Sequence, residues 1–494
     1  MVPPGAPGGR PGGDRLRGAM VRLCDDAARL LDEQGRAEVA ALRAALDRPL
    51  RVAVVGRVSA GKSTLVNALI GRRVAPTAAG ECTQLVTTYR YGSPDRAVLV
   101  PRDSRDRPRE LALDGPLPDA LPVDPAGVDR IEVRLQSGLL RELTLVDTPG
   151  LGSLARPGDE ATRRAVLGAE DSSLREAGRA SAVLFLLRDV EKLDDMELVQ
   201  AHHTAAGLAG AAAASVIGLL SHADLYGAGP WADEDPFVAA AAAAARMARD
   251  HAALLAGVVP VAGLLAEAAR TGGVTEDDAR TLAALAGTDP VRLQLLEQLG
   301  PPEGVDPAAA TRLLHRFGPY VLRHGSGPAA GGAGPLREWL LARSGLVQVR
   351  RLVERQFLRN SRPLVVDRAL RRLEQLSRTR ATGSRAGRDL RDLVEQVRLS
   401  PATHRIAELR ALESLSGGGS EAAQVAVALR AMIEHDDAWQ RLAADRPLPP
   451  PELHRALDGR RAWAQRMTST ARDPVARDAA RVLSRSLGLL AEQL

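Results

Sequence analysis

Hydrophobic residues follow two different patterns along the chain, and the change between them falls near residue 270. Before it, short apolar runs typical of buried strands alternate with segments of helical period. The predicted strands span residues 52–56, 84–91, 96–100, 129–135, 142–147, 181–187, 214–220 and 258–261. Helices are predicted between several of them, at 62–70, 159–177, 193–209 and 235–255. This alternation predicts an α/β domain with a mostly parallel sheet and helices on both faces.

The second half of the chain has a helical pattern. No strand pattern follows residue 275, and the Gly/Pro-rich stretch 325–335 is typical of a linker or a long loop. Beyond that stretch, helices are predicted at 336–343, 345–377, 387–414, 420–444 and 451–492. Their apolar stripes, for example Leu370 and Leu373, are expected to bury one another in a bundle.

The N-terminal segment 14–46 also has apolar residues at helical spacing, with Gly35 as a point of interruption. Segments 101–128 and 226–236 are rich in Pro, Gly and Asp, and we expect them to form surface loops. The predicted organisation is a flexible tail at 1–13, an N-terminal helix at 14–49 that packs with the bundle, an α/β domain at 50–335 and a helical bundle at 336–494.

Composition narrows the class of protein. A chain of 494 residues is too long for one core, and 45% hydrophobic with 26% charged residues is typical of a soluble globular protein. Only 2% of the residues are aromatic, which argues against a stacking platform for single-stranded nucleic acid. The net charge of +5 is mild for this length and does not by itself indicate DNA, RNA or a membrane as partner.

The cysteines and the uncharged segments indicate the cellular compartment of the protein and how it could associate with a membrane. The two cysteines, Cys24 and Cys82, exclude a disulfide framework and favour a reducing cytoplasm. The Pro/Gly-rich N-terminus lacks the apolar core of a signal peptide. The longest uncharged run, 204–221, is dominated by Ala and Gly, and we interpret it as a helix end followed by a buried strand. We therefore expect any association with a membrane to be peripheral.

A phosphate-binding motif follows the first predicted strand. Residues 56–63, GRVSAGKS, fit the pattern GxxxxGK[ST] and open a predicted helix. In this setting backbone N–H groups wrap phosphates, a lysine contacts the outer phosphates and a hydroxyl reaches Mg²⁺. The lysine is Lys62, one of only two lysines among 66 basic residues. The expected phosphate-binding residues are Gly56, Val58, Ser59, Ala60, Gly61, Lys62, Ser63 and Thr64.

A second motif, LVDTPG at 145–150, ends another predicted strand. Asp147 is placed to hold Mg²⁺ through water, together with the hydroxyl of Ser63, and the N–H of Gly150 to contact the γ-phosphate. Alone, DTPG is a turn that occurs by chance, and an aspartate that merely caps the strand is the alternative interpretation. Its position after a strand and downstream of the phosphate-binding loop favours the Mg²⁺ site.

A third motif selects the base. Ser221, His222 and Asp224 match the guanine-reading pattern [NT]KxD with two substitutions. Asp224 would accept two hydrogen bonds from the guanine ring N–H and amine, and His222 would stand where the lysine covers the base. A plain loop aspartate is the alternative. Ala262 and Gly263, after the strand 258–261, would close over the base.

In this order, GRVSAGKSTLVNALIG, ECTQLVTTYRYG, LVDTPGLG and LLSHADLYG resemble the motifs of bacterial dynamin-like GTPases. The resemblance is to the soluble actinobacterial kind, which includes isoniazid-inducible proteins. RLLHRFGPYVLR and LLARSGLVQVRRLVERQF resemble the region where such proteins leave the GTPase domain for a helical stalk. The resemblance covers roughly residues 14–380 and is strongest over 51–225.

The resemblance implies a dynamin-type GTPase domain at 50–335 and a neck and stalk at 336–494. It assigns Thr83 as the switch threonine, which would bind Mg²⁺ and the γ-phosphate only when GTP is bound. The alternative is a threonine that only begins a strand. Thr87 and Thr88 are less favoured candidates for the switch role. Dynamins often carry a polar residue where this chain has Val58, so no side chain of the loop is an evident water-positioner. The implied catalytic residues are Lys62, Ser59, Thr83 and Arg57. For Arg57, an ordinary solvated arginine is the alternative. The implied Mg²⁺ ligands are Ser63, Thr83 and Asp147.

The implied function is hydrolysis of GTP to GDP, coupled to the formation of homodimers through the GTPase domain and to membrane remodelling. A second dynamin-like paralogue is a further candidate partner. An arginine-rich corner between two bundle helices would contact an anionic membrane surface, or be an ordinary solvated face; it includes Arg378, Arg380, Arg385 and Arg388. The alternatives are an RNA- or ribosome-associated assembly GTPase and, less favoured, a nucleotide-binding scaffold with weak or no hydrolysis. DNA is not expected as a partner.

Overall fold

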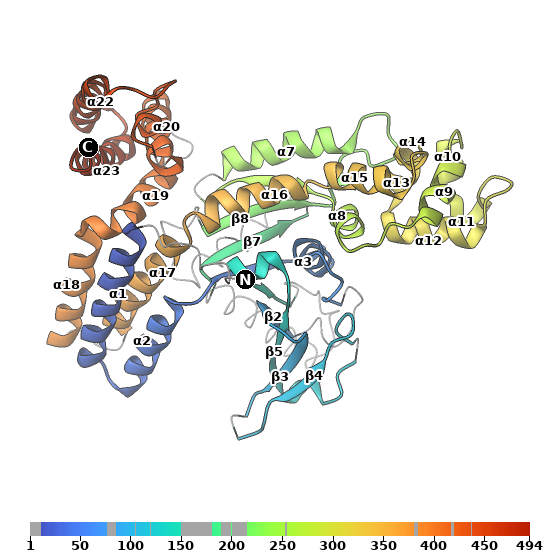
Figure 1. The fold of residues 1–494 in the computed structure, drawn as a ribbon, viewed down its shortest axis with the longest axis horizontal. Coiled ribbons are helices and arrows are strands. Elements are labelled where there is room, and N and C mark those ends of the chain that lie inside the picture. Colours follow the sequence, from blue (N-terminus) through green and yellow to red (C-terminus); the bar gives the residue numbers. More distant parts are fainter. Residues whose placement is uncertain are drawn as a thin grey trace, which may run out of the picture.

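The computed structural model describes residues 11–76, 85–103, 105–118, 120–149, 180–188, 199, 215–251, 254–379, 384–415, 419–435 and 437–494. The described chain forms three parts side by side (Figure 1). A central domain is built on a β-sheet, a lobe of short helices extends from one side of it, and a bundle of longer helices lies on the other side.

The central sheet has nine strands in the order β4-β3-β5-β2-β6-β1-β7-β8-β9. The run β6-β1-β7-β8-β9 is parallel throughout. β2 and β5 are parallel to each other, β2 is antiparallel to β6, and β3 is antiparallel to both β4 and β5. The strands are β1 (Leu50–Gly56), β2 (Val86–Tyr91), β3 (Arg96–Pro101), β4 (Arg109–Ala112), β5 (Val128–Leu135), β6 (Leu143–Asp147), β7 (Ala182–Leu187), β8 (Val216–Ser221) and β9 (Val258–Val261).

Every predicted strand is present, so the mostly parallel α/β architecture is confirmed. β4 was missed, because its residues RELA are largely exposed at the sheet edge and carry no run of apolar side chains. The predicted loop 101–128 therefore contains an edge strand that pairs with β3. The predicted helices 159–177 and 193–209 lie outside the described residues, except for residue 199.

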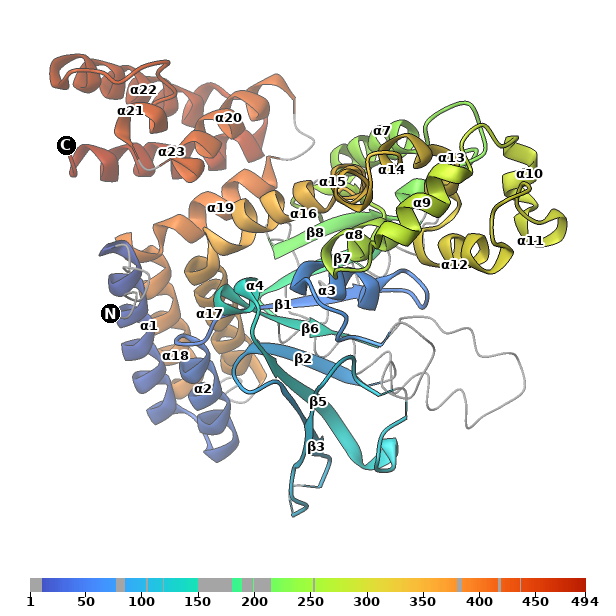
Figure 2. The same cartoon turned by 45° about the vertical axis from the view of Figure 1, so that its right-hand side comes forward.

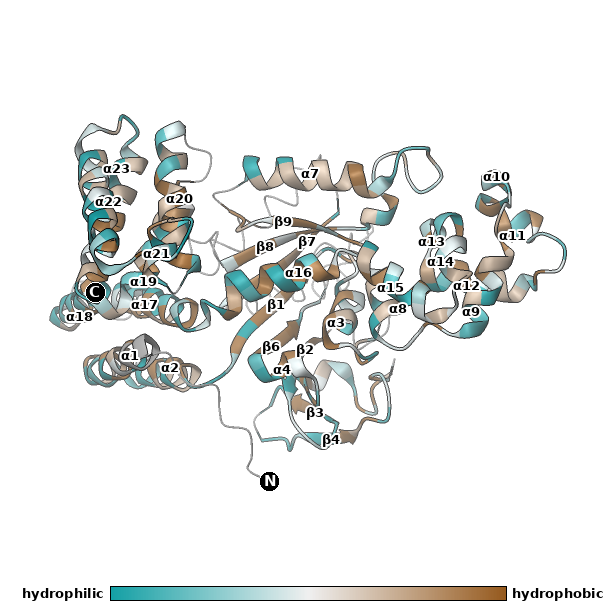
Figure 3. Cartoon of the chain, turned by 45° about the horizontal axis from the view of Figure 1, so that its top comes forward, coloured by the Kyte–Doolittle hydropathy of each residue, from teal (hydrophilic) through white to brown (hydrophobic). Residues whose placement is uncertain are grey.

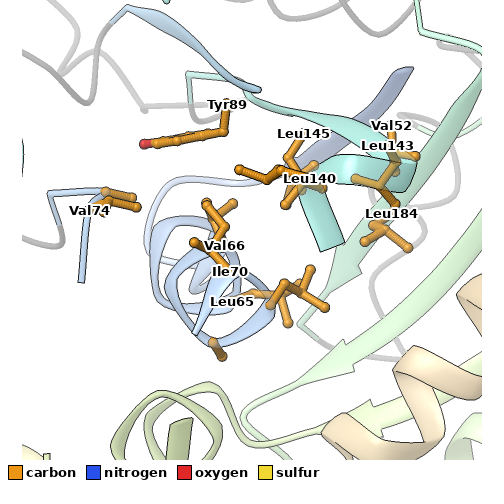
Figure 4. Packing of buried hydrophobic residues seen from close by; sticks show 14 of the residues in the cluster. Val52, Leu65, Val66, Ile70, Val74, Tyr89, Leu140, Leu143, Leu145 and Leu184 are labelled. Carbon is orange, nitrogen blue, oxygen red and sulfur yellow. The ribbon is translucent and has the colours of Figure 1, made fainter. Parts of the chain in front are cut away.

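The central strands are apolar because both faces of the sheet are covered. In β1, Val52 and Val54 point into one core and Ala53 and Val55 into another. Helices α3 (Lys62–Ile70) and α16 (Leu346–Val353) contribute to the first core, and α7 (Pro236–Asp250) contributes to the second. Figure 4 shows Leu65, Val66 and Ile70 of α3 in one cluster with residues of β1, β6, β7 and α4 (Gly138–Glu142). Figure 3 shows the hydrophobic colouring of the central strands.

The lobe of short helices packs around its own core, which includes Leu282, Phe317, Tyr320 and Leu336. The predicted linker 325–335 is instead helical at both ends, and its residue Ala329 is buried in this core. The helices of the lobe are α8 (Gly263–Arg270), α9 (Glu276–Ala284), α10 (Pro290–Gln294), α11 (Leu296–Leu299), α12 (Pro307–Phe317), α13 (Pro319–His324), α14 (Ser326–Ala329) and α15 (Ala333–Arg343).

The bundle has two cores of its own. α17 (Ser361–Thr379) and α18 (Arg385–Leu399) pack with α1 (Pro11–Leu30) and α2 (Glu33–Ala45), so the N-terminal helices lie beside helices more than 300 residues later in the sequence (Figure 2). The second core joins α19 (His404–Ser414), α20 (Ser420–Glu434), α21 (Ala438–Arg441), α22 (Pro450–Thr470) and α23 (Pro474–Ala491). Among the described residues, none of the helices combines the length and the apolar character needed to cross a bilayer.

Several sequence expectations differ from the structure, and the predicted helices 387–414 and 451–492 are each divided in two. The bundle was predicted to begin at residue 336, whereas α15 and α16 place Leu340 in the lobe and Leu346 and Val349 in the sheet core. The predicted long helix 345–377 is also divided, by a π-helical turn at Glu354–Leu358 that separates α16 from α17. Helical periodicity alone does not reveal which partner an amphipathic helix packs against, and this is why both features were missed.

The docking of α1 on α17 and α18 predicts an unreactive thiol. Cys24 is buried in this interface, and burial, with the neighbouring carboxylate of Asp25, raises the pKa of its thiol to about 11. In a Cys82→Ser background, Cys24 should react with Ellman's reagent at least about 100-fold more slowly than after unfolding in guanidinium, because little thiolate forms and access is blocked.

Met20→Ala, which removes a neighbouring buried side chain from the same interface, should accelerate the reaction, whereas the exposed change Arg22→Ala should not. A thiol that reacts equally fast before and after unfolding would contradict this packing.

Candidate functional site

Four loops meet at one edge of the sheet, because β1, β6, β8 and β9 run parallel within it and end there. The register places Asp147 beside Val54 of β1, and Ser221 beside Val261 of β9. The predicted phosphate, Mg²⁺ and base motifs follow these strands. The sheet therefore brings together residues that are far apart in the sequence.

The loop after β1 has the backbone of an anion cradle. Ser59 and Gly61 both have positive φ angles, of 61° and 88°, and the N–H of Ala60 donates to the carbonyl of Arg57 at 3.2 Å. No atom lies within 4 Å of a Cβ built on Gly61, so the glycine is required for its backbone conformation and not for space. α3 begins directly afterwards at Lys62, and its N-terminal N–H groups face the same loop.

Lys62 is folded into this loop. Its Nζ donates to the carbonyl oxygens of Arg57 at 2.9 Å and Gly56 at 3.2 Å. Burial lowers the pKa of Lys62 from its ordinary value, and the carboxylate of Asp147 acts in the opposite direction. A buried ammonium held mainly by carbonyl dipoles gains a full counter-charge when a phosphate enters the loop.

Asp147 and Ser63 form an oxygen pair at the end of β6. The Ser63 hydroxyl donates to Asp147 Oδ2 at 3.0 Å, while Asp147 Oδ1 is buried with no hydrogen-bond partner among the described residues. Burial raises the pKa of Asp147 to about 6, although Lys62 and the Ser63 hydroxyl both favour its charged form. The N–H and hydroxyl of Thr148 both donate to the carbonyl of Val54 and hold Thr148 against β1.

These oxygens fit a divalent cation. A hydroxyl and a carboxylate with one unsatisfied oxygen are the ligands that Mg²⁺ takes when it also binds phosphate and water. Within the described part of the chain no group of three His, Cys, Asp or Glu side chains offers a complete protein site. The residues present are therefore suited to hold Mg²⁺ jointly with a phosphate, not alone.

Beside the loop that follows β1 lies an open cleft. Asp224 lines it with only 5% of its surface exposed, and burial raises the pKa of its carboxyl group. His222 has a positive φ of 54°, and its Nε2 lies 3.2 Å from the carbonyl oxygen of Ser59, so it bridges the two loops. Ser221 donates its hydroxyl to the carbonyl of Leu187 at 3.0 Å and fixes the start of the motif.

The other wall of the cleft was not foreseen from the sequence. Gly263 lines the cleft as expected, whereas Ala262 is buried in the core of the lobe and does not; Leu264, Gly318 and Pro319 also line it. Gly318 and Pro319 belong to the stretch RLLHRFGPYVLR, which carried only a resemblance and no assigned chemistry. Because they follow Asp224 at a long distance in the sequence, only the tertiary fold brings them to the cleft.

A buried asparagine was also missed. The Asn67 side chain accepts from the N–H groups of Val74 and Ala75 and donates to the carbonyl of Ala75 and to Glu267 Oε1 at 2.7 Å. It thus fastens the segment after α3 to both α3 and α8. An asparagine inside a predicted apolar helix, LVNALI, is the signal that could have revealed it, because a buried amide requires partners.

Several predicted residues are only partly tested. Thr83, Gly150 and Arg380 lie outside the described residues. Thr87 is buried directly opposite Asp147 in the β2–β6 pair, and Thr88 is buried beside Val146. Val58 is 45% exposed, whereas Arg57 is half-buried and provides a carbonyl oxygen to Lys62.

The arginine-rich corner is partly neutralised. Arg378 pairs with Glu374, and the exposed Arg385 lies 3.8 Å from Asp389. Arg388 is exposed at the start of α18. Helical spacing places a carboxylate four residues from both Arg378 and Arg385.

Comparisons with known proteins identify relatives of this chain. A model of the dynamin family matches residues 52–174. The isoniazid-induced protein IniC of Mycobacterium tuberculosis is 35% identical over 349 residues, which are 68% of each chain. The isoniazid-induced protein IniA of the same species is 32% identical over 165 residues, covering 31% of this chain and 26% of IniA.

A bacterial dynamin-like protein of Nostoc punctiforme is 27% identical over 153 residues, covering 28% of this chain and 20% of that protein. Among solved structures, an oligomerised bacterial dynamin pair described as sensing and tethering membranes matches with a TM-score of 0.30 and 14% identity, over 99% of this chain and 76% of that one. At that TM-score the structural match carries no argument.

The Asn67 network predicts a local dependence of stability. Asn67→Ala should lower the free energy of unfolding in urea by about 2–3 kcal/mol, because the N–H groups of Val74 and Ala75 would lose their acceptor while still buried. The control is Arg73→Ala, which removes only a half-exposed guanidinium 3.7 Å from the same Glu267 and should change stability by less than about 0.5 kcal/mol. Equal effects of the two substitutions would show that the network contributes nothing specific.

Proposed function

The chain belongs to the dynamin family, and from that premise we propose that it binds GTP with Mg²⁺ and hydrolyses it to GDP and phosphate. The observation that carries the proposal is that Lys62 and the Ser63–Asp147 pair lie at the same carboxyl edge of the sheet as the cleft that Asp224 lines. Each supports a different part of the nucleotide: the phosphates, the cation and the base.

In this proposal the phosphates lie in the loop 56–63. The N–H groups of the loop and of the α3 N-terminus surround them, and Lys62 exchanges its two carbonyl partners for phosphate oxygens. Ser63 and Asp147 would hold Mg²⁺, which supplies charge stabilisation to the transferring phosphoryl group. The expected switch residues Thr83 and Gly150 belong to the same proposal.

The group that orients the attacking water is proposed to come from outside the side chains of the loop. Val58, at the relevant position, is apolar and exposed. A backbone group, Arg57 or a residue from a second GTPase domain across a dimer would serve instead. We propose such a homodimer, with a second dynamin-like chain as a further partner, because dynamin-like domains usually pair across the nucleotide.

The output proposed is nucleotide-dependent binding and remodelling of a membrane from the cytoplasm, with the bundle as stalk. Its contact surface would be the corner that includes Arg378, Arg385 and Arg388, together with Arg380. The ion pairs of Arg378 and Arg385 are exposed and therefore contribute little, so lipid phosphates can replace their carboxylate partners at small cost.

Base selection gives the sharpest test of the nucleotide site. Wild-type protein should hydrolyse GTP and not ATP, and Asp224→Asn should lower kcat/KM for GTP by about 100-fold or more, because an amide cannot accept both guanine hydrogen bonds. The same variant should gain xanthosine triphosphate as substrate, since the amide N–H₂ group can donate to the carbonyl that xanthine carries at this position. Turnover is measured by phosphate release.

Lys62→Ala is the control for the phosphate half of the site. It should abolish turnover of GTP in the wild-type background and of xanthosine triphosphate in the Asp224→Asn background. Turnover of GTP that is equal in wild type and Lys62→Ala would remove the claim of an enzyme and leave a scaffold. Unchanged GTP preference in Asp224→Asn would place the base elsewhere.

Membrane binding is tested with vesicles. Replacing Arg378, Arg385 and Arg388 by alanine should weaken co-sedimentation with phosphatidylglycerol vesicles about 100-fold at low salt, because each arginine near an anionic surface contributes about 1 kcal/mol. The control replaces three exposed arginines of α22 and α23, namely Arg455, Arg466 and Arg481. Wild-type protein that is retained by RNA and not by vesicles, across a salt series, would favour the assembly-GTPase alternative instead.

A further inference from the structure

We propose that the turn at Gly318 and Pro319, between α12 and α13, is a specificity-determining wall of the base cleft and sets the affinity for guanine nucleotides. The inference rests on the proposed function, since it concerns the same cleft. Neither residue belongs to the motifs that read the nucleotide in the sequence, and both are supplied by the helical lobe and not by the sheet edge.

The turn lies within contact distance of the groups that face the base. A Cβ built on Gly318 would stand 3.7 Å from Asp224 Oδ2 and 3.9 Å from Leu264 Cδ1. Asp224 and Leu264 both line the cleft. A longer side chain at position 318 would start between them and extend into the space that a base needs.

The backbone of the turn suits this place. Gly318 has φ 82° and ψ 169°, a conformation that side-chain-bearing residues rarely adopt, and its N–H donates to the carbonyl of Leu314 at 2.9 Å. Pro319 occupies the first position of α13 and has no N–H. Neither Gly318, whose N–H is already donated, nor Pro319 therefore offers an N–H to the carboxylate of Asp224, which can accept from a base instead.

Aromatic packing holds the turn from behind. Tyr320 is buried, lies edge-on to Phe237 of α7 at 5.0 Å between ring centroids, and is stacked on Trp339 of α15 at 6.0 Å. The chain has only four Phe, four Tyr and four Trp residues, and five of these twelve lie in the core of the lobe: Trp231, Phe237, Phe317, Tyr320 and Trp339. This concentration makes the wall rigid where the rest of the chain relies on Ala and Leu.

Polar contacts fasten the same wall to the base-reading loop. The segment that follows Asp224 is held at Pro230, whose carbonyl accepts from Arg323 of α13 at 3.2 Å, and at Asp235, which pairs with Arg343 of α15 at 2.8 Å. On the opposite side, the N–H of Ala262 donates to the carbonyl of Ser344 at the end of α15 at 3.0 Å. Both sides of the cleft therefore make contacts with α13 or α15, and these contacts fix the distance between the two sides.

The experiment compares Gly318→Val with Gly300→Val by calorimetric titration of GDP, and separately of pyrophosphate, with Mg²⁺ present. Gly300 is a glycine of the same lobe with a positive φ of 69° and no atom within 4 Å of its built Cβ, and it does not line the cleft. Gly318→Val should weaken GDP binding about 10-fold or more, because the added side chain enters the base space. Pyrophosphate, which has no base, should bind all three proteins alike.

Pro319→Ala is the second variant, and it should also weaken GDP binding while leaving pyrophosphate binding unchanged, because it removes a ring from the wall and adds an N–H beside Asp224. GDP binding that is equal in wild type, Gly318→Val and Pro319→Ala would overturn the inference and leave the proposed function intact. A loss of pyrophosphate binding in Gly318→Val together with wild-type GDP affinity in Pro319→Ala would also overturn it, since the turn would then be structural. Absence of GDP binding in the wild type would instead refute the proposed function itself.

Discussion

Parallel pairing of β1 with β6 on one side and with β7 on the other places the carboxyl ends of the central strands at a single edge. That pairing sets Asp147 beside β1, so that the first turn of α3 delivers Ser63 to its carboxylate and Lys62 to the loop carbonyls. The pairing itself depends on apolar side chains on both faces of each strand, since polar strands of this kind would not be covered by helices. The chemistry of the edge is therefore a consequence of the core.

The site leaves some groups poorly satisfied, and this is informative. Asp147 keeps a buried oxygen without a partner among the described residues, and Lys62 is buried against carbonyls. Buried charges of this kind cost stability unless a ligand completes them. The surrounding structure compensates through well-satisfied contacts nearby, such as Asn67 with its four hydrogen bonds and Thr148 on the carbonyl of Val54. A rigid frame around an incomplete charge set is suited to binding an anion with its cation.

The sequence predicted the parts of the fold that have a local signature. Short apolar runs marked the central strands, and GxxxxGK[ST] after such a run marked the phosphate loop. β4 has no apolar pattern because it is an exposed edge, and α16 resembles any amphipathic helix until its partner is known. Gly318 and Pro319 could not be identified from the sequence for a different reason. Only the tertiary fold brings them close to Asp224, and no motif spacing links these positions in the sequence. The place of Ser221, His222 and Asp224 at a strand end was predictable, but the anchoring of the segment after them through Arg323 and Arg343 was not.

The central claim is that this edge binds a guanine nucleotide together with Mg²⁺. The most direct measurement is a calorimetric titration of a non-hydrolysable GTP analogue into the protein, first with Mg²⁺ and then with the cation chelated, beside the corresponding adenine analogue. The account predicts one guanine nucleotide per chain, weaker binding when Mg²⁺ is removed, and no binding of the adenine analogue at the same concentration. Equal heats for the two bases, or guanine binding that is indifferent to Mg²⁺, would contradict it.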